Sequence, residues 1–223
     1  QLWRLNAPYL GVEQKIPLAR IGAALGIFSN RDLIAIYSSN YLGKDEIDRL
    51  KDDANAIKAC FEGDSPTRIQ ALEQLFNRAE TAQDRYIWWI AGARAAAYIR
   101  PDQELGDKVN FLIPALLSGG LDVAVGAWQS ELAQMNPKET NLAFAAASLG
   151  SPRLFQPISE GRLSEFTNRD ESKNRHLSRI FVAALAGLDR LDPVLIQANS
   201  EKLGLDLSNN SKWSKDLHNA ARY

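Results

Sequence analysis

The chain has 223 residues, of which 45% are hydrophobic and 24% are charged, with 26 basic against 27 acidic residues and a formal net charge of -1. This composition is typical of a globular protein and excludes an intrinsically disordered chain. The balanced charge opposes a nucleic-acid-binding surface, which needs an excess of basic residues. No run of about 18 uninterrupted apolar residues occurs, so we expect no membrane span.

The cysteine content bears on the cellular compartment, and the two ends of the sequence bear on the length of the protein. Cys60 is the single cysteine, so an internal disulfide and a cysteine metal cluster are both excluded. A chain with one thiol suits either the cytoplasm or the periplasm, so the compartment stays open between them. The chain begins at Gln1 rather than Met and stops at Tyr223, inside a stretch with a helical pattern. We therefore expect it to be a piece of a longer protein.

The N-terminal part of the chain predicts short helices separated by clear breaks. Pro17 acts as a breaker, and a short helix is predicted over Leu18–Phe28. Ser29 has the character of an N-cap, and Asp32 stands in the third helical position as its capping-box partner. The next helix should therefore begin directly after Ser29.

An amphipathic helix follows over Lys44–Phe61. Its apolar residues recur at intervals of three and four, and its opposite face is charged. Cys60 lies on the apolar edge of this helix, so we expect a buried and unreactive thiol. A new helix is predicted to start after Gly63, with Ser65 as its N-cap and Pro66 as the proline of its first turn.

The segment Asp84–Arg100 is predicted to be the central helix of the fold. It is apolar on nearly every side, and Arg94 is its only internal charge. A helix that is apolar all round has to be covered on more than one face. A lone charge on such a helix reaches solvent, pairs with a carboxylate or lines a cavity.

Three helices are predicted after Pro101. The first covers Val109–Leu117 and ends at a pair of glycines, and the second is one amphipathic helix over Leu121–Met135. Asn136–Glu139 combines an N-cap, a first-turn proline and a glutamate at the third helical position. This is the strongest start signal in the chain, and Gly150 marks the end of its helix.

The last third of the chain alternates helices with polar segments. One or two short helices are predicted over Ser151–Phe166, and the polar run Thr167–Arg175 is expected to be a solvated loop or a helix entry. Helices are then predicted around Leu177–Leu188 and over Asp192–Gly204, and a last helix carries Trp213.

Together these patterns predict an all-α fold of about ten to twelve helices without a convincing strand. Pro66, Pro101 and Pro137 fall 35 and 36 residues apart, which suits a helix-turn-helix repeat. In this period and in proline placement the chain resembles the tetratricopeptide class of helical repeats, with Ala96 at the position of that repeat's alanine if Pro101 closes the repeat. The early Trp, Leu-Gly and Tyr positions of the repeat are not filled, and the spacing fails after Pro137.

The resemblance implies stacked antiparallel helix hairpins that form an α-α superhelix. The alternative is an irregular compact helical bundle. In either case we expect residues 1–223 to form a single all-helical domain, and residues 167–175 are the alternative position for a boundary within it.

No catalytic motif is present in the sequence. A nucleophile elbow, a phosphate-binding glycine loop, a dinucleotide fingerprint and a His-Glu-x-x-His pair are all missing. His176 and His218 are the only histidines, and both are expected on the surface. We therefore expect no enzymatic activity, no metal and no cofactor.

The leading functional hypothesis is a non-enzymatic scaffold that binds a protein or peptide partner along a helical groove. The candidate binding residues are Trp88, Arg94 and Trp128, because Trp and Arg dominate interface hot spots. The simpler interpretation places the two tryptophans in the core and gives Arg94 a structural role. The alternative hypothesis is a helical accessory domain of an enzyme whose catalytic part lies outside this chain. Nucleic-acid binding ranks third, because the charge balance opposes it.

Overall fold

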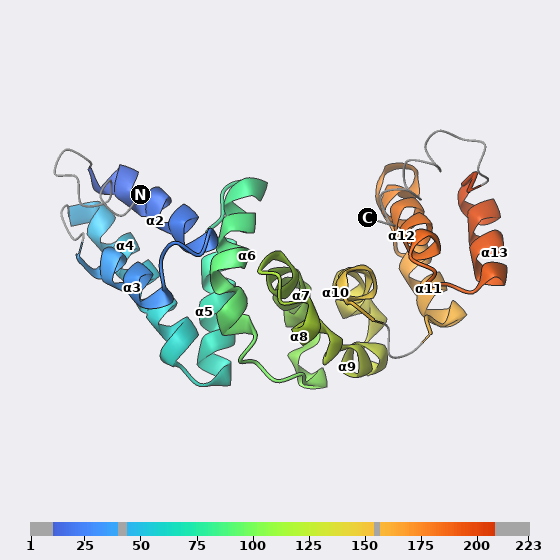
Figure 1. Cartoon of the computed structure of the whole chain (residues 1–223), viewed down its shortest axis with the longest axis horizontal. Helices are drawn as coiled ribbons and strands as arrows, with labels where there is room; N and C mark the ends of the chain where they lie inside the picture. The colour runs from blue at the N-terminus through green and yellow to red at the C-terminus, as the bar shows by residue number, and fades with distance from the viewer. Residues whose placement is uncertain (1–10, 40–43, 154–156, 208–223) are drawn as a thin grey trace. The chain divides into compact units, whose positions relative to one another are not determined.

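A computed structural model describes residues 11–39, 44–153 and 157–207 of the chain (Figure 1). Over these ranges the regular secondary structure is helical and no strand occurs, so the all-α prediction is confirmed for them. No helix in this part of the chain is long and apolar enough to cross a membrane. The predicted last helix, with Trp213, lies outside the described residues.

The chain groups into two compact units. The single all-helical domain over residues 1–223 stays a prediction. The first unit comprises residues 1–101 and 111–124, and the second comprises residues 102–110 and 125–223. The alternative boundary at 167–175 lies inside the second unit. The chain passes between the two units at three points. One lies between Pro101 and Asp102, and the other two fall within the helices α7 (Val109–Ser118) and α8 (Asp122–Gly126).

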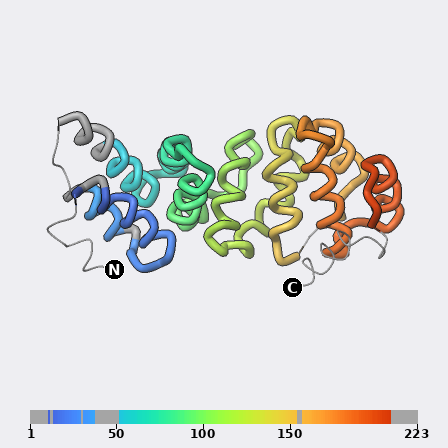
Figure 2. Tube along the Cα trace, turned by 90° about the horizontal axis from the view of Figure 1, so that it is seen from above, coloured from blue at the N-terminus to red at the C-terminus, as the bar shows by residue number. Residues whose placement is uncertain are grey.

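The first unit consists of helices joined by short connections. Its helices, besides parts of α7 and α8, are α2 (Val12–Ala24), α3 (Asn30–Ser39), α4 (Lys44–Glu62), α5 (Ser65–Asn77) and α6 (Ala82–Ala96). α4 packs against α3 and α5, α5 packs against α6, and α2 packs against α3 and α6 (Figure 2). Short turns connect α4, α5 and α6, and each of these helices contacts the other two.

The predicted central segment Asp84–Arg100 includes most of α6, and its central position in the fold stays a prediction. α6 packs against α2, α4 and α5, and it is helical as expected. Trp88 is 2% exposed, and its ring centroid lies 6.4 Å from that of Tyr37. At Gly92 a Cβ atom would lie 2.8 Å from Leu72 Cδ2, so the absence of a side chain there allows α5 and α6 to approach closely.

Two helix starts in the first unit differ from the prediction, and one agrees with it. α2 begins at Val12 and contains Pro17, because that proline removes only its own hydrogen bond while buried Ile16 and Ala19 hold the helix against the core. The N-cap of α5 is Asp64, not Ser65. The predicted capping box of Ser29 and Asp32 is confirmed: each backbone N–H donates to the other side chain, at 2.9 and 3.2 Å.

The second unit is built around one helix, α10. Besides parts of α7 and α8, its helices are η1 (Gln103–Lys108), α9 (Gln129–Gln134), α10 (Pro137–Gly150), α11 (Glu160–Asn168), η2 (Lys173–Arg175), α12 (His176–Gly187) and α13 (Pro193–Leu203). α10 packs against η1, α9, α11 and α12, and α12 packs against α13. The buried core of this unit consists of Ile158, Leu163, Phe166, Phe181, Val182, Leu185, Leu191 and Leu205.

The single helix predicted over Leu121–Met135 is wrong, because the chain forms two short helices there, α8 and α9. α8 ends at Gly126, a residue with low helix propensity. The Trp128 N–H then donates to the Val125 carbonyl, a tighter bond than that of an α-helix. This turn places the Trp128 side chain in the core, where it is 2% exposed.

The start signal at Asn136–Glu139 is confirmed, since the Asn136 side chain accepts from the Lys138 N–H at 3.1 Å and opens α10. The three spaced prolines, however, do not occupy equivalent positions. Pro66 and Pro137 stand in the first turns of α5 and α10, whereas Pro101 lies between α6 and η1. Their regular spacing therefore does not mark the same point of successive helix pairs.

Candidate functional site

The three binding residues predicted from the sequence lie in different surroundings. Trp88 and Arg94 belong to the first unit and Trp128 to the second. Both tryptophans are only 2% exposed, so neither offers a surface to a partner. Arg94 is exposed in the last turn of α6, where a cation is favourable next to the helix C-terminus. The binding role of these residues stays a prediction, and only Arg94 has the accessibility that it requires.

A cavity of about 240 Å³ lies within the second unit, between α9, α10 and the start of α11. Its walls combine apolar and polar groups. The lining residues are Gln129, Leu132, Ala133, Phe144, Ala147, Ser148, Pro157, Ile158, Ser159 and Arg162. Arg162 is the only charged side chain among them. Apolar walls with a few convergent polar groups are typical of ligand sites.

The start of α11 positions Arg162 in this lining. Ser159 is the N-cap, and its Oγ accepts a hydrogen bond from the Arg162 N–H at 3.3 Å. Ile158 precedes the cap and Leu163 follows in the fourth helical position, and both are buried in the core of the unit. Such a pair of apolar residues around an N-cap fixes the angle at which the chain enters the helix. The direction of the Arg162 side chain follows from this entry.

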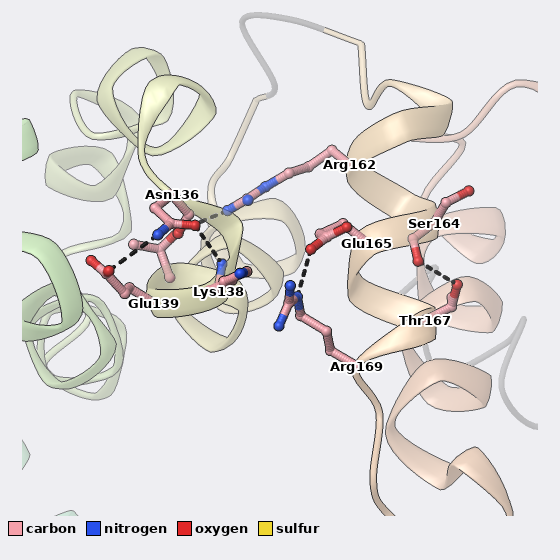
Figure 3. Close-up of polar contacts among 9 residues, drawn as sticks. Asn136, Lys138, Glu139, Arg162, Ser164, Glu165, Thr167 and Arg169 are labelled. Atoms are coloured by element: carbon pink, nitrogen blue, oxygen red, sulfur yellow. Dashed lines mark hydrogen bonds and ion pairs between the residues drawn. The ribbon is translucent and has the colours of Figure 1, made fainter.

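The Arg162 side chain extends from α11 to α10, as Figure 3 shows. Its Nη2 donates to Thr140 Oγ1 at 2.8 Å, and the Thr140 hydroxyl donates in turn to the Asn136 carbonyl at 3.1 Å. The guanidinium carbon lies over the Phe144 ring, 4.5 Å from the ring centroid. A cation over an aromatic face is attracted by the ring quadrupole. These contacts hold the positive charge beside an apolar wall.

Two nitrogens of Arg162 have no acceptor in the part of the chain that the structure describes. Nε and Nη1 are both buried and unpartnered. Burial lowers the pKa of the Arg162 guanidinium, and the charge of Glu165 opposes this shift. The Glu165 carboxylate is itself engaged, since its Oε1 accepts from Arg169 Nε at 2.6 Å (Figure 3). A buried donor without an acceptor is costly, so an external acceptor would be stabilised at this position.

α10, which forms one wall of the cavity, is held at both ends. The Asn110 side chain bridges two of its backbone groups: Oδ1 accepts from the Ala143 N–H at 3.0 Å, and Nδ2 donates to the Glu139 carbonyl. In an uninterrupted helix these two backbone groups bond to each other. At the other end, Arg190 donates to the Ser148 and Ser151 carbonyls, each at 2.6 Å, and so caps the helix C-terminus.

Sequence reasoning did not identify Arg162, because neither local spacing nor a motif distinguishes it from other surface arginines. The available local signal was the position of Ser159 three residues before it, which predicts a helix start but no site. Its partner Thr140 lies 22 residues away on another helix. The site therefore emerges only from the packing of α10 against α11.

Cys60 and His176 do not line the cavity. Burial raises the pKa of the Cys60 thiol to about 12, so the reactive thiolate is suppressed. His176 is exposed, and His218 lies outside the described residues. Among the residues with described placement, no group of three or more His, Cys, Asp or Glu side chains is placed to hold a metal ion.

Comparison with known proteins yields no relative: no family model, no curated protein and no solved structure matches this chain. The fold and the site define an all-α protein with a small cavity that presents one arginine among apolar side chains.

Proposed function

We propose that the chain is a non-enzymatic helical scaffold that binds another protein or a peptide, and that its antiparallel helix pairs stack as in an α-α superhelix. The observation that carries the proposal is the cavity beside Arg162 in the second unit. It combines apolar walls with a cation that holds unpartnered donors. Helical-repeat proteins bind partners along extended concave surfaces.

The composition of the cavity favours recognition over catalysis. Its ten lining residues include no His, Cys, Asp or Glu. A hydroxyl nucleophile such as that of Ser148 or Ser159 needs an adjacent base, and the lining supplies none. Arg162 has only hydrogen-bond donors and keeps its proton at neutral pH. Its chemistry is thus the binding and orientation of an acceptor.

The size of the cavity favours one side chain or chain end of a partner. At about 240 Å³ it is smaller than the roughly 300–1,000 Å³ of sites that enclose drug-sized ligands. A contact of this size gives modest affinity, so we expect a Kd on the order of 1–100 μM for an isolated peptide.

Selection from a random peptide library displayed with both linear ends accessible, on the immobilised full chain, tests the proposal. We expect peptides to be enriched over the bare support and to bind the chain saturably in fluorescence polarisation. Ala133→Trp should weaken this binding, because Ala133 is exposed and lines the cavity, so the new side chain occludes its mouth.

Gln134→Trp is the matched control, since Gln134 is the exposed neighbour on α9 and does not line the cavity. Absence of any enriched peptide with saturable binding would overturn the proposal. Equal weakening by both variants would show that the contact lies elsewhere on the chain and would also contradict it in this form.

A further inference from the structure

We infer that the cavity beside Arg162 receives the C-terminal residue of the partner chain, with its carboxylate on the guanidinium and a large apolar side chain against the walls. This inference rests on the proposed function and specifies the occupant of that site. It follows from three properties of the described lining: its charge, the unpartnered hydrogen-bond donors of Arg162 and the apolar side chains of its walls.

The charge of the lining selects an anion. Arg162 is the only ionisable residue among those that line the cavity. Glu165, whose charge acts on Arg162, is bonded to Arg169. The N-terminus of α11 adds backbone N–H groups and the positive end of its dipole beside Ser159, which also lines the cavity. An anionic group is therefore favoured over a neutral or cationic one.

The free donors of Arg162 select a planar acceptor. One of the five N–H groups of the guanidinium donates to Thr140 Oγ1, and the nitrogens Nε and Nη1 have no acceptor among the described residues. A carboxylate forms short charge-assisted hydrogen bonds with a guanidinium, often two in parallel. Nε and Nη1 are covered by neighbouring atoms, so hydrogen bonds from them to a carboxylate require the guanidinium to move from its position over Phe144.

The apolar walls distinguish a chain terminus from an internal acidic residue. Leu132, Phe144 and Ile158 line the cavity. Leu132 and Ile158 are buried and Phe144 is partly exposed, so the Phe144 ring is the main apolar side-chain surface among these three that an occupant covers. A C-terminal residue carries its carboxylate and its side chain on the same Cα atom, so one residue meets both requirements. An internal Asp or Glu carries its carboxylate on a short stem and leaves the walls uncovered. Recognition of C-terminal carboxylates is an established mode of peptide binding.

The direct test is a titration of the full chain, followed by NMR, with three N-acetylated tripeptides. The first is acetyl-Gly-Gly-Phe with a free C-terminal carboxylate, the second is the same peptide as its C-terminal amide, and the third is acetyl-Gly-Glu-Gly amide. We expect the free acid to bind saturably and to shift the Nε–H resonance of Arg162. The other two should bind about tenfold more weakly or less, because they lack either the carboxylate or the apolar group beside it.

Variants locate the site of binding. Arg162→Gln should weaken binding of the free acid about tenfold or more. Arg175→Gln removes an exposed arginine of the same unit outside the lining and should leave the affinity unchanged. If Arg162→Gln fails to fold, the exposed lining residue Ala133 keeps the inference testable. Ala133→Glu should weaken the free acid and Ala133→Lys should strengthen it, each a few-fold, because the added charge lies at the rim.

The results separate failure of the inference from failure of the proposed function. Three results would overturn the inference. The free acid and the amide could bind equally well, or the peptide with the internal glutamate could bind more tightly than the free acid. The third is that Arg162→Gln and both Ala133 variants leave the affinity for the free acid unchanged. The proposed function would survive any of these results if library peptides still bind and Ala133→Trp blocks them. If no library peptide binds, the proposed function fails and the inference fails with it.

Discussion

The guanidinium carbon of Arg162 lies over the ring of Phe144 at 4.5 Å from its centroid, and this pair joins α11 to α10. Phe144 also meets Phe181 of α12 edge-on, with ring centroids 6.1 Å apart. The aromatic ring thus lies between a charged group at the cavity and the apolar core of the unit. Changes at this junction are expected to affect both stability and binding.

Thr140→Val should destabilise the chain more than Thr167→Val. Both threonines are fully buried, and both hydroxyls donate to a nearby carbonyl in the preceding turn. Thr140 Oγ1 also accepts from Arg162, so its removal leaves a partly buried cation with one further unmet donor. We expect Thr140→Val to lower the free energy of unfolding by about 1–3 kcal/mol, and Thr167→Val by about 1 kcal/mol.

Urea unfolding of the two threonine variants measures this difference. A double-mutant cycle of Thr140→Val with Arg162→Gln should give a coupling free energy on the order of 1 kcal/mol. Equal effects of the two single substitutions, with no coupling to Arg162, would show that the hydrogen bond between the side chains adds nothing to stability.

Asn110→Asp should be more damaging than Asn110→Ala. The Asn110 amide donates to the Glu139 carbonyl and accepts from the Ala143 N–H. Alanine leaves these two groups free to form their own helical bond. Aspartate still accepts from Ala143 but places a negative charge against the Glu139 carbonyl, and we expect an additional loss of about 1–3 kcal/mol.

Chemical denaturation and amide exchange of Ala143 check the Asn110 prediction. In Asn110→Ala, the Ala143 amide should still exchange slowly with solvent, because its N–H bonds to the Glu139 carbonyl of the same helix, α10. If Asn110→Ala is as unstable as Asn110→Asp, the amide would be an indispensable part of α10 and the predicted closure would be wrong.

Cys60 should react slowly and should make stability depend on alkaline pH. Its pKa is raised from 9.0 to about 12 by burial, so the folded chain keeps the thiol protonated while the unfolded chain ionises it. Between these pH values the unfolded state binds fewer protons, and stability therefore falls as pH rises. The contribution is fully present below pH 9 and is lost as pH approaches 12.

Comparison of wild type with Cys60→Ala isolates this effect from the titration of lysines and tyrosines. The difference in unfolding free energy between the two chains should shift in favour of the variant as pH rises above 9. Modification of the thiol by a disulfide reagent at neutral pH should be orders of magnitude slower in the native chain than in urea. Rapid native labelling would show that Cys60 is accessible.

Alanine substitutions at two helical glycines should change the free energy of unfolding in opposite directions. At Gly92 of α6 a Cβ atom would meet Leu72 Cδ2 at 2.8 Å, so Gly92→Ala forces α5 and α6 apart. We expect a loss of about 1–3 kcal/mol, typical of an overpacked core. At Gly161 of α11 no atom lies within 4 Å of the added Cβ, so Gly161→Ala should stabilise the chain by about 0.5–1 kcal/mol.

Thermal unfolding of the two glycine variants provides the measurement. Gly161→Ala should raise Tm, and Gly92→Ala should lower it. An unchanged Tm in Gly92→Ala would mean that Leu72 and Phe76 move aside at little cost, contrary to the expected tight contact between the two helices.

Local sequence predicted the helix boundaries best where the controlling atoms lie within a few residues of each other. The Ser29 and Asp32 box and the Asn136 cap are examples, because each side chain bonds a backbone N–H only two or three residues away. Prediction failed where burial decides the path of the chain. Trp128 interrupts the expected helix over Leu121–Met135 and turns into the core, and Pro17 stays within α2.

The sequence by itself determined that this protein is built from helices, because apolar spacing and capping are short-range properties of the chain. It also singled out the segment around Trp88 as a helix with buried residues, although Tyr86 and Arg94 of the same helix are exposed. Only the tertiary structure decided that Arg162 faces Thr140 and Phe144 across two helices, and that a cavity opens beside them. The physical reason is that burial and missing hydrogen-bond partners depend on residues far apart in the chain, which local pattern does not bring together.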